Sequence, residues 1–399
     1  MHRPSSVSKV LVILPRLEIG GGELVALEAI RGLVDRRIGV TLLVVIAGGP
    51  LAMAVPRVIE LYSIVRASRS GLQQSPLRVA SAVLARLPSL LRLTRDHDII
   101  LAVGEFGGSL YLGALLSQAT GIPLIGWATG EVFKMTTVKG SAVWRSVIHR
   151  KLLRHCYPVA RRILALSEHS KRDLTSNIPS IEGKIKIVCS PVPVDRVQRQ
   201  ARQPIPQVYR KWFDVPVIAS LGRHEERKGF DILIRAHAVL RQRRVQQRLL
   251  IIGPEGPATV SLRDLIATLG VEESVILSGY VPNPFPLIRA STVFALASRS
   301  EGLGVALVEA MALGKPVVVS ETAGGAVEVV GGGEYGIIVP GEDEVALADA
   351  LERILRSPEE QAFWAKKAFE RSLAFNVDRF IEQLICVMDE VRSECGRGG

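Results

Sequence analysis

The sequence predicts an α/β protein with two doubly wound parallel sheets, one in each half of the chain. Three observations support this: short continuous apolar runs recur along the chain, longer amphipathic segments separate them, and the series occurs twice. Apolar runs without polar alternation are typical of parallel strands covered by helices on both faces. With 399 residues, 48% of them hydrophobic, the chain can form two such cores, and a disordered chain is excluded.

The expected elements follow from these runs. Strands are expected at 9–14, 40–46, 98–103, 122–128, 162–167 and 184–189, and then at 215–222, 248–253, 274–279, 292–298, 316–320 and 336–340. Amphipathic helices are expected at 231–241, 345–356, 358–371 and 376–391. The stretch 190–216 is rich in Pro, Gln and Arg and lacks apolar periodicity, which predicts a linker. We therefore expect an N-terminal domain over 1–200, a C-terminal domain over 201–375, and a last helix in 376–399 that packs back on the first domain.

The charge is unevenly distributed. Residues 1–200 carry 27 basic and 13 acidic side chains, a net +14, whereas the rest of the chain has a net charge of −3. The excess peaks at 61–95, where six Arg occur with no acid, so we expect an anionic partner for the first half. Nucleic acid is disfavoured because Tyr62 is the only aromatic residue in that segment.

Cysteine usage and hydropathy indicate the cellular compartment of the protein. Four distant Cys without a C-x-x-C favour neither a disulfide framework nor a zinc site, and predict a reduced, cytoplasmic protein. The first apolar run is too short for a secretory signal. The uncharged stretch 38–56 is long enough to span a bilayer, but Gly48, Gly49 and Pro50 interrupt it, which favours a buried strand followed by a loop.

In such sheets, ligands bind beyond the carboxyl ends of the strands, and with two sheets the cleft between the domains is the expected site. The segment 298–316, SRSEGLGVALVEAMALGKP, follows an expected strand. Its glycines allow backbone amides to approach a phosphate or a sugar hydroxyl at a helix N-terminus. Were 301–309 helical throughout, Glu301 and Glu309 would lie ~12 Å apart, too far for a glycosidase pair and suited to two parts of one long ligand. A capping Glu and a solvated Glu remain the alternative.

Two more loops follow expected strands. In SLGRHEERKGF (220–230), Arg223 and Lys228 flank a strand-to-helix turn and suit a diphosphate, although a solvated charged loop remains open. GGGE at 20–23 lacks the G-x-G-x-x-G spacing and has no dinucleotide acid after the second strand, so NAD is disfavoured. Gly21 and Gly22 still permit close approach of a phosphate or a sugar.

The combined motifs resemble the family 4 retaining glycosyltransferases of the GT-B fold. The resemblance covers nearly the whole chain and is strongest over 217–355. Its carriers are GGGE at 20–23, ALSEHSKRDL at 165–174, SLGRHEERKGFDILIRA at 220–236, SGYVPN at 278–283, SEGLGVALVEAMALGKPVV at 300–318, AGGAVEVV at 323–330 and YGIIVPGEDEVALADAL at 335–351.

The resemblance implies roles for these residues. It implies that Glu301, Arg223 and Lys228 are the catalytic residues. It implies further that Arg223 and Lys228 hold the pyrophosphate of a UDP- or GDP-sugar and neutralise the charge that develops as it leaves, and that Glu309 accepts hydrogen bonds from the ribose. It places the donor sugar at Glu301 together with Gly302 and the amides of Leu303 and Gly304. The backbone at Tyr280 and Val281 would contact the base, and Gly21 and Gly22 would line the donor phosphate or the acceptor. The nucleotide sugar is a substrate, and no cofactor or catalytic metal is expected; Asp96–His97–Asp98 matches D-x-D but precedes a strand, at the wrong end of the sheet.

One position departs from the family pattern. Many members carry a His after the strand equivalent to 122–128, where this chain has Thr129, and no other His is nearby in the sequence. His149 and His155 fall in the following helical segment. Glu105 and Glu131, both in loops after strands, are the other acceptor-side candidates.

The expected activity is therefore metal-independent hexosyl transfer, with retention, to a hydroxyl acceptor that is lipid-linked or a precursor of a cell-surface polysaccharide. Arg78, Arg86 and Arg92 lie in a basic amphipathic segment that suits the anionic inner face of the cell membrane; a solvated domain helix is the alternative. Two other functions remain open: a degenerate, non-catalytic GT-B protein that binds a membrane or a polyanion, and a nucleotide-sugar epimerase on the same fold.

Overall fold

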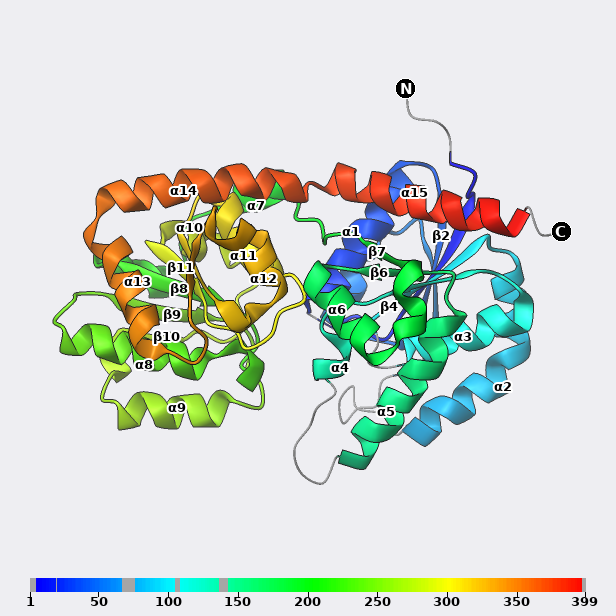
Figure 1. Cartoon of the computed structure of the whole chain (residues 1–399), viewed down its shortest axis with the longest axis horizontal. Helices are drawn as coiled ribbons and strands as arrows, with labels where there is room; N and C mark the ends of the chain where they lie inside the picture. Colours follow the sequence, from blue (N-terminus) through cyan, green and yellow to red (C-terminus); the bar gives the residue numbers. More distant parts are fainter. Residues whose placement is uncertain (1–4, 19, 67–75, 105–107, 136–142, 397–399) are drawn as a thin grey trace. The chain divides into compact units, whose positions relative to one another are not determined.

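The computed structural model describes residues 5–18, 20–66, 76–104, 108–135 and 143–396. The chain forms two compact units (Figure 1): unit 1 is made of Met1–Pro191 and Val377–Gly399, and unit 2 of Val192–Asn376. Each unit is an α/β structure around one parallel sheet. The predicted fold class, two doubly wound parallel sheets, is confirmed.

Unit 1 holds a seven-stranded sheet of order β3-β2-β1-β4-β5-β6-β7. Its strands are β1 (Lys9–Leu14), β2 (Gly39–Ile46), β3 (Glu60–Val65), β4 (Ile99–Val103), β5 (Leu124–Trp127), β6 (Arg162–Ala165) and β7 (Ile185–Ile187). Its helices are α1 (Gly21–Asp35), α2 (Pro76–Arg95), α3 (Ser109–Thr120), α4 (Val132–Met135), α5 (Val143–Cys156), α6 (Glu168–Asn177) and α15 (Val377–Gly396). The central strands are buried along almost their whole length, as continuous apolar runs require.

Unit 2 holds a six-stranded sheet of order β10-β9-β8-β11-β12-β13. Its strands are β8 (Val217–Leu221), β9 (Arg248–Ile252), β10 (Val275–Leu277), β11 (Val293–Leu296), β12 (Val317–Ser320) and β13 (Ile337–Val339). Its helices are α7 (Val194–Gln200), α8 (Phe230–Gln242), α9 (Thr259–Thr268), α10 (Phe285–Ala290), α11 (Val305–Ala312), α12 (Gly325–Val329), α13 (Glu344–Arg356) and α14 (Pro358–Ser372). All pairings in both sheets are parallel, with registers such as Val10↔Val40 in unit 1 and Ile218↔Leu249 in unit 2.

Two parts of the structure differ from the predicted elements. Strand β3 has no counterpart among the predicted strands, because it lies at the sheet edge and exposes its first four residues, so its sequence lacks a continuous apolar run. The stretch predicted as a linker contains α7, which packs on α10 and α11. Unit 2 therefore begins at Val192, whereas the sequence placed the boundary after residue 200.

The last helix, α15, belongs to unit 1 and lies along α1 (Figure 1). Its apolar stripe is buried: Phe380 stacks on Trp127 with ring centroids 5.4 Å apart, and Ile381 covers Gly32. A Cβ atom on Gly32 would lie 2.4 Å from the Ile381 side chain, so glycine permits this close approach.

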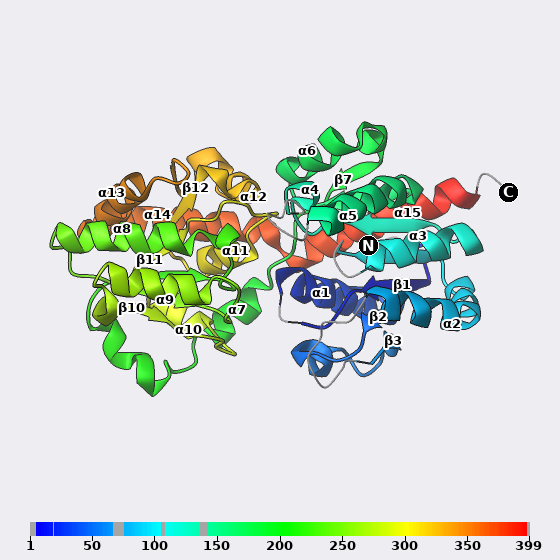
Figure 2. The ribbon, with the colours of Figure 1, turned by 90° about the horizontal axis from the view of Figure 1, so that it is seen from below.

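The uncharged stretch 38–56 forms β2 and a short 3-10 turn, as expected from its Gly-Gly-Pro interruption. None of the helices that the structure describes is both long and apolar enough to cross a membrane. In unit 1 the basic helix α2 packs on α3 and β3 (Figure 2).

Candidate functional site

The candidate donor site lies where the strand order of the unit 2 sheet reverses. Strands β8 and β11 are neighbours there, and their following loops leave the carboxyl edge in opposite directions along the sheet. In doubly wound sheets this switch point is where ligands bind. The loop after β8 carries Arg223 and Lys228, and the loop after β11 carries Glu301.

These two loops are joined by a buried ion pair. Lys228 Nζ lies 2.6 Å from Glu301 Oε1, and the two side chains are only 13% and 7% exposed. Ser298 Oγ donates to the same carboxylate oxygen at 2.8 Å, and Arg227 Nη1 lies 3.7 Å from the other one. Two residues that the sequence named as catalytic candidates are thus in direct contact.

The turn after β8 is shaped by Gly229, whose φ is +62°. A Cβ atom there would lie 1.9 Å from the carbonyl oxygen of Ala297, at the end of β11. Only glycine accommodates both this backbone conformation and this contact. The start of α8 therefore packs directly on β11, which brings Lys228 within reach of Glu301.

The surrounding charges control the ionisation of Glu301. Burial alone would raise the pKa of this carboxyl, but the attraction of Lys228 and Arg227, with the hydrogen bonds from Lys228 and Ser298, holds the pKa below its ordinary value. The group is therefore an ionised carboxylate at neutral pH. It holds the Lys228 ammonium at the carboxyl edge of the sheet, where an anionic ligand can share it.

Glu309 lies in a different environment on α11. Its carboxylate is half-buried and makes no hydrogen bond within the described part of the chain. Burial raises its pKa to about 7, and Arg196 of α7 only partly offsets that effect. An acidic side chain whose pKa is raised by burial, with one basic neighbour and no hydrogen bond to its carboxylate in the described residues, is a candidate for a ligand-binding position.

The segment between Glu301 and Glu309 is not helical throughout. The separation of ~12 Å that a continuous helix would give therefore does not apply. Helix α11 begins at Val305, after Gly304 in a left-handed conformation with φ of +86°. The Leu303 side chain is buried at 3% exposure. A Cβ on Gly325 would lie 1.9 Å from the carbonyl oxygen of Gly302, so this loop packs tightly on the start of α12.

The remaining donor-side candidates are more exposed. Arg223 is 52% exposed, and its Nε lies 3.7 Å from Glu225. Tyr280 is 52% exposed in the loop after β10, and Val281 beside it is half-buried. Arg223 and Tyr280 both follow strands at the carboxyl edge of the same sheet. Arg223 shares Glu225 with Arg227, which in turn lies 3.7 Å from Glu301.

Arg227 and Ser298 were not among the predicted site residues. A solvated charged loop was the alternative for 220–230, yet Arg227 pairs with Glu225 at 2.8 Å and lies 3.7 Å from Glu301. Ser298 lies two residues after the buried strand β11 and precedes Glu301 by three residues, a spacing that could have indicated its contact.

In unit 1 the corresponding switch point lies between β1 and β4. Gly21 and Gly22 open α1 after β1, and Thr129 follows β5. A Cβ on Gly22 would lie 3.4 Å from the Thr129 side chain, and one on Gly104 would lie 3.9 Å from it. Thr129 therefore faces the glycine loop, whereas Glu105 falls outside the described residues.

Glu131 is the third acceptor-side candidate, and it is almost completely buried, at 1% exposure. Its Oε1 lies 2.8 Å from Nε2 of His169 and 3.2 Å from Nζ of Lys134. The linear sequence showed no histidine near Thr129; the fold supplies His169 from the first turn of α6, which follows β6, the neighbour of β5 in the sheet. The only indication of this histidine in the sequence was the segment ALSEHSKRDL, which contributed to the family resemblance.

Asp98 of the D-x-D segment is engaged in contacts within unit 1. Asp98 precedes β4 and accepts hydrogen bonds from the backbone amides of Ser8 and Lys9 at 2.7 and 3.0 Å, and it pairs with Arg392 of α15. Across the described residues, no three His, Cys, Asp or Glu side chains are grouped as metal ligands would be.

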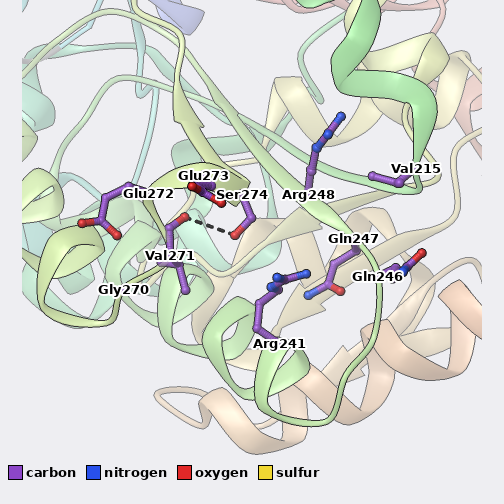
Figure 3. A pocket seen from close by; sticks show the side chains of 10 residues that line it. All are labelled: Val215, Arg241, Gln246, Gln247, Arg248, Gly270, Val271, Glu272, Glu273 and Ser274. Carbon is purple, nitrogen blue, oxygen red and sulfur yellow. Dashed lines mark hydrogen bonds between the residues drawn. The ribbon is translucent and has the colours of Figure 1, made fainter.

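A pocket of about 660 Å³ opens at the opposite end of the unit 2 sheet (Figure 3). It is lined at the amino ends of β9 and β10 by residues such as Arg248, Glu272 and Glu273. None of the donor-side residues named above lines it. The carboxyl edge, with its buried ion pair, remains the candidate site.

Comparisons with known proteins agree with this geometry. The model for glycosyl transferases group 1 matches residues 202–371, and the model for glycosyltransferase family 4 matches residues 19–196. Together they account for most of the chain. The chain therefore belongs to the group 1 glycosyltransferases of the GT-B fold.

Two relatives are similar in sequence. The N-acetylgalactosamine-N,N'-diacetylbacillosaminyl-diphospho-undecaprenol 4-alpha-N-acetylgalactosaminyltransferase of Campylobacter jejuni is 30% identical over 58% of this chain and 61% of that enzyme. D-inositol 3-phosphate glycosyltransferase 1 of Catenulispora acidiphila is 27% identical over 100% of this chain and 97% of that enzyme.

Among solved structures, Anabaena HepE in complex with UDP and glucose has a TM-score of 0.76 and 21% identity, and the match covers 94% of this chain and 98% of that one. The lipopolysaccharide glycosyltransferase WaaG has a TM-score of 0.71 and 17% identity, with 95% and 99% of the two chains covered. These likenesses establish the fold.

Proposed function

We propose that this protein transfers a hexosyl group from a UDP- or GDP-sugar to a hydroxyl acceptor, with retention and without a catalytic metal. The observation that carries the proposal is the buried Lys228–Glu301 pair at the switch point of the unit 2 sheet. The ion pair holds an ammonium where a diphosphate would need it, so little reorganisation is required when the ligand arrives.

The donor roles follow from the chemistry of each group. Lys228 and Arg223 bind the pyrophosphate and neutralise the charge that develops as it leaves. Glu301, with the amides of Leu303 and Gly304, binds the donor sugar. The assignment of these roles to these residues rests on the family pattern and on the contact between Lys228 and Glu301.

Three further assignments complete the donor site. Glu309 accepts hydrogen bonds from the ribose hydroxyls, which suits a half-buried carboxylate that makes no hydrogen bond in the described residues. The backbone at Tyr280 and Val281 contacts the base. Gly21 and Gly22 admit the donor phosphate or the acceptor close to the backbone.

Both nucleotides stay in the proposal. The complexes of the structural neighbour HepE contain UDP and UDP-glucose, whereas a mannosyltransferase relative from Mycolicibacterium smegmatis is named as GDP-mannose-dependent. The names of relatives that act on diphospho-undecaprenol and phosphatidylinositol support a lipid-linked acceptor, whereas the relative named for D-inositol 3-phosphate acts on a small soluble one.

A thermal-shift panel of UDP, GDP, ADP and their common sugar conjugates tests the proposal. A ligand at 100 times its Kd stabilises the folded protein by ~2.7 kcal/mol, which moves the Tm by a few degrees. We expect one nucleotide series to shift the wild type and to lose that shift in Glu309→Ala. Glu272→Ala, at the opposite end of the sheet, is the matched control and should respond like the wild type.

The outcomes are distinct. A shift of equal size in wild type and Glu309→Ala would refute the ribose role. A wild type that no nucleotide shifts would refute the transferase and favour the degenerate GT-B alternative. Consumption of a nucleotide sugar with an epimeric nucleotide sugar as the product would favour the epimerase.

We also propose that helix α2 binds the anionic inner face of the cell membrane, which places the enzyme in the cytoplasm as a peripheral protein. Arg78, Arg86 and Arg92 are exposed on this helix, and so are Leu77 and Leu84, at 82% and 67%. Exposed basic and apolar side chains on one helix are suited to a surface of anionic lipid.

The membrane role is tested by co-sedimentation with vesicles of phosphatidylcholine and phosphatidylglycerol. Replacing the three α2 arginines with Gln should lower the bound fraction, since each basic residue contributes ~1 kcal/mol near such a surface. The control replaces the exposed unit 2 residues Arg263, Arg353 and Arg356 with Gln. Equal binding by the two triple variants would refute a specific role for α2.

A further inference from the structure

Arg299 connects the two loops of the candidate donor site. It lies in the loop after β11, two residues before Glu301, and its side chain is 26% exposed. Nη1 and Nη2 donate to the two carboxylate oxygens of Asp231 at 2.9 and 2.8 Å, which makes a bidentate pair with the first turn of α8. Nη1 also donates to the carbonyl oxygen of Glu226 at 2.6 Å. This arginine therefore joins the loop after β11 to the turn and to the helix that follow β8.

A third loop holds the other side of the guanidinium. Glu342 follows β13, and its Oε1 lies 2.6 Å from Nε of Arg299, while its Oε2 accepts from Nη2 at 2.8 Å. The backbone of Glu342 has a φ of +57°, a left-handed conformation that a residue other than glycine keeps only where its contacts hold it. The three guanidinium nitrogens thus have contacts for as many N–H donors as the group possesses. Arg299 is therefore suited to holding loops together, and not to binding a ligand.

The main chain makes the same connection. The backbone amide of Arg299 donates to the carbonyl oxygen of Arg227 at 2.8 Å. Arg227 is the middle residue of the 3-10 turn Glu226–Lys228, and the carbonyl group before it accepts from the Arg299 side chain. Both carbonyl groups that precede Lys228 are therefore anchored to the loop that carries Glu301.

The pair between Arg299 and Asp231 is charged at neutral pH. Burial acts to raise the pKa of the Asp231 carboxyl, but the hydrogen bonds and the charge of Arg299 outweigh burial and hold the pKa below its ordinary value. A guanidinium stays protonated in proteins. The bidentate geometry of the pair fixes the orientation of the two groups as well as their distance.

The ion pair between Lys228 and Glu301 does not suffice to hold Lys228 when a ligand is bound. A diphosphate competes with Glu301 for the ammonium, and sugar hydroxyls compete with Lys228 for the carboxylate. The contacts of Arg299 described above involve neither of these two side chains. They can therefore persist while Lys228 and Glu301 exchange each other for the ligand.

We propose that Arg299 is a positioning residue for the donor diphosphate: it clamps the turn Glu226–Lys228 to the loop that carries Glu301, and so keeps the Lys228 ammonium in place when the diphosphate binds. The inference rests on the proposed function, in which Lys228 binds the pyrophosphate. It adds to that function a residue that acts through Lys228 without touching the ligand.

The test compares Arg299→Lys with the wild type. Lysine keeps the charge, but it cannot make the bidentate pair with Asp231. Isothermal titration measures the Kd of UDP or GDP, whichever the thermal-shift panel selects, and the Kd of the corresponding nucleoside, uridine or guanosine. We expect the Kd of the diphosphate to rise about 10-fold, as for a weakened hydrogen bond between charged groups, and that of the nucleoside to stay within about twofold of the wild type.

A second comparison shows whether Arg299 acts through Lys228. The background for it is Lys228→Met with Glu301→Gln, which has neither the ammonium to be positioned nor a buried carboxylate left without its cation. Adding Arg299→Lys to this background should leave the Kd of the diphosphate unchanged. Asp231→Asn, which removes the charge that holds the guanidinium, is an independent variant and should raise the Kd of the diphosphate as Arg299→Lys does.

The matched control is Arg243→Lys. Arg243 also bridges two acids, Asp349 and Glu352, and it also joins α8 to α13, but it does so at the C-terminal end of α8. This variant loses an arginine clamp of the same kind in the same unit. Its Kd values for the diphosphate and for the nucleoside should equal those of the wild type.

The possible failures are distinguishable. A wild-type Kd for the diphosphate in both Arg299→Lys and Asp231→Asn would overturn the role of Arg299 and leave the donor site standing. A nucleoside Kd that rises by the same factor as the diphosphate Kd would show a general structural effect, and would also overturn the role. So would a further rise in the Lys228→Met, Glu301→Gln background, because Arg299 would then act independently of Lys228. A wild type that binds no nucleoside diphosphate would overturn the proposed function, and this inference with it.

Discussion

Glu309 makes the stability of the protein depend on pH in a defined direction. Burial raises its pKa from an ordinary 4.5 to about 7. A tenfold change in proton affinity is worth ~1.4 kcal/mol, so this difference corresponds to about 3 kcal/mol. Water that reaches the half-buried carboxylate lowers that figure, which is therefore a ceiling.

The sign follows from linkage. The folded state binds the Glu309 proton more tightly than the unfolded state, so its contribution to stability is fully present below about pH 4.5 and is lost as the pH rises through about 7. Glu309→Gln resembles the protonated form at every pH. Its unfolding free energy should exceed that of the wild type only slightly near pH 5 and by at most ~3 kcal/mol near pH 9.

Urea unfolding of wild type and Glu309→Gln, each measured from about pH 5 to about pH 9, gives this difference directly. Glu272→Gln, an exposed acid of the same unit, is the control and should show a difference that does not change with pH. A constant difference between wild type and Glu309→Gln would refute the raised pKa. If ribose hydroxyls donate to the carboxylate, nucleotide affinity of the wild type should also increase as the pH rises through about 7, and the Gln variant should lose this dependence.

Three other substitutions test contacts in unit 2, each measured by the change in unfolding free energy. Lys228→Met leaves Glu301 buried without its closest cation and should cost 3–5 kcal/mol, roughly, with most of the loss recovered when Glu301→Gln is added; an unchanged stability would refute the buried pair. Gly229→Ala should destabilise by more than ~1 kcal/mol, since its φ is +62° and a Cβ would meet the Ala297 carbonyl oxygen at 1.9 Å; a neutral effect would contradict that geometry. Asp343→Ala removes the side chain that accepts from two amides at the start of α13 and should cost about 1 kcal/mol, and no loss would show that water replaces the cap.

The fold was predictable because burial on both faces of a parallel strand produces a continuous apolar run. Every strand of unit 2 had such a run, and so had every strand of unit 1 except β3. β3 is an edge strand with Leu61 and Tyr62 about half exposed, so its sequence carries a mixed pattern. α7 was taken for linker because it has seven residues and one fully buried side chain, Val197, which is too little for an apolar periodicity.

The site was predictable only where its members follow strands and match a motif. Lys228 and Glu301 were named on those grounds, but their contact depends on which strands are neighbours in the sheet, and the order of the chain does not contain that information. The same holds for His169, which is far from Glu131 in the sequence and hydrogen-bonded to it in the fold. A search of the linear neighbourhood of Thr129 for a histidine could not find it.

The return of α15 to unit 1 has a consequence for how the protein is made. All of Val192–Asn376 is inserted between two segments of unit 1, so a ribosome releases the complete second unit before the first one has its final helix. Until then, Trp127 and Gly32 lack the Phe380 and Ile381 side chains that cover them in the finished protein. The nascent chain must therefore keep that apolar surface of unit 1 out of other contacts throughout the synthesis of unit 2, and a helix translated after all of unit 2 completes the first unit.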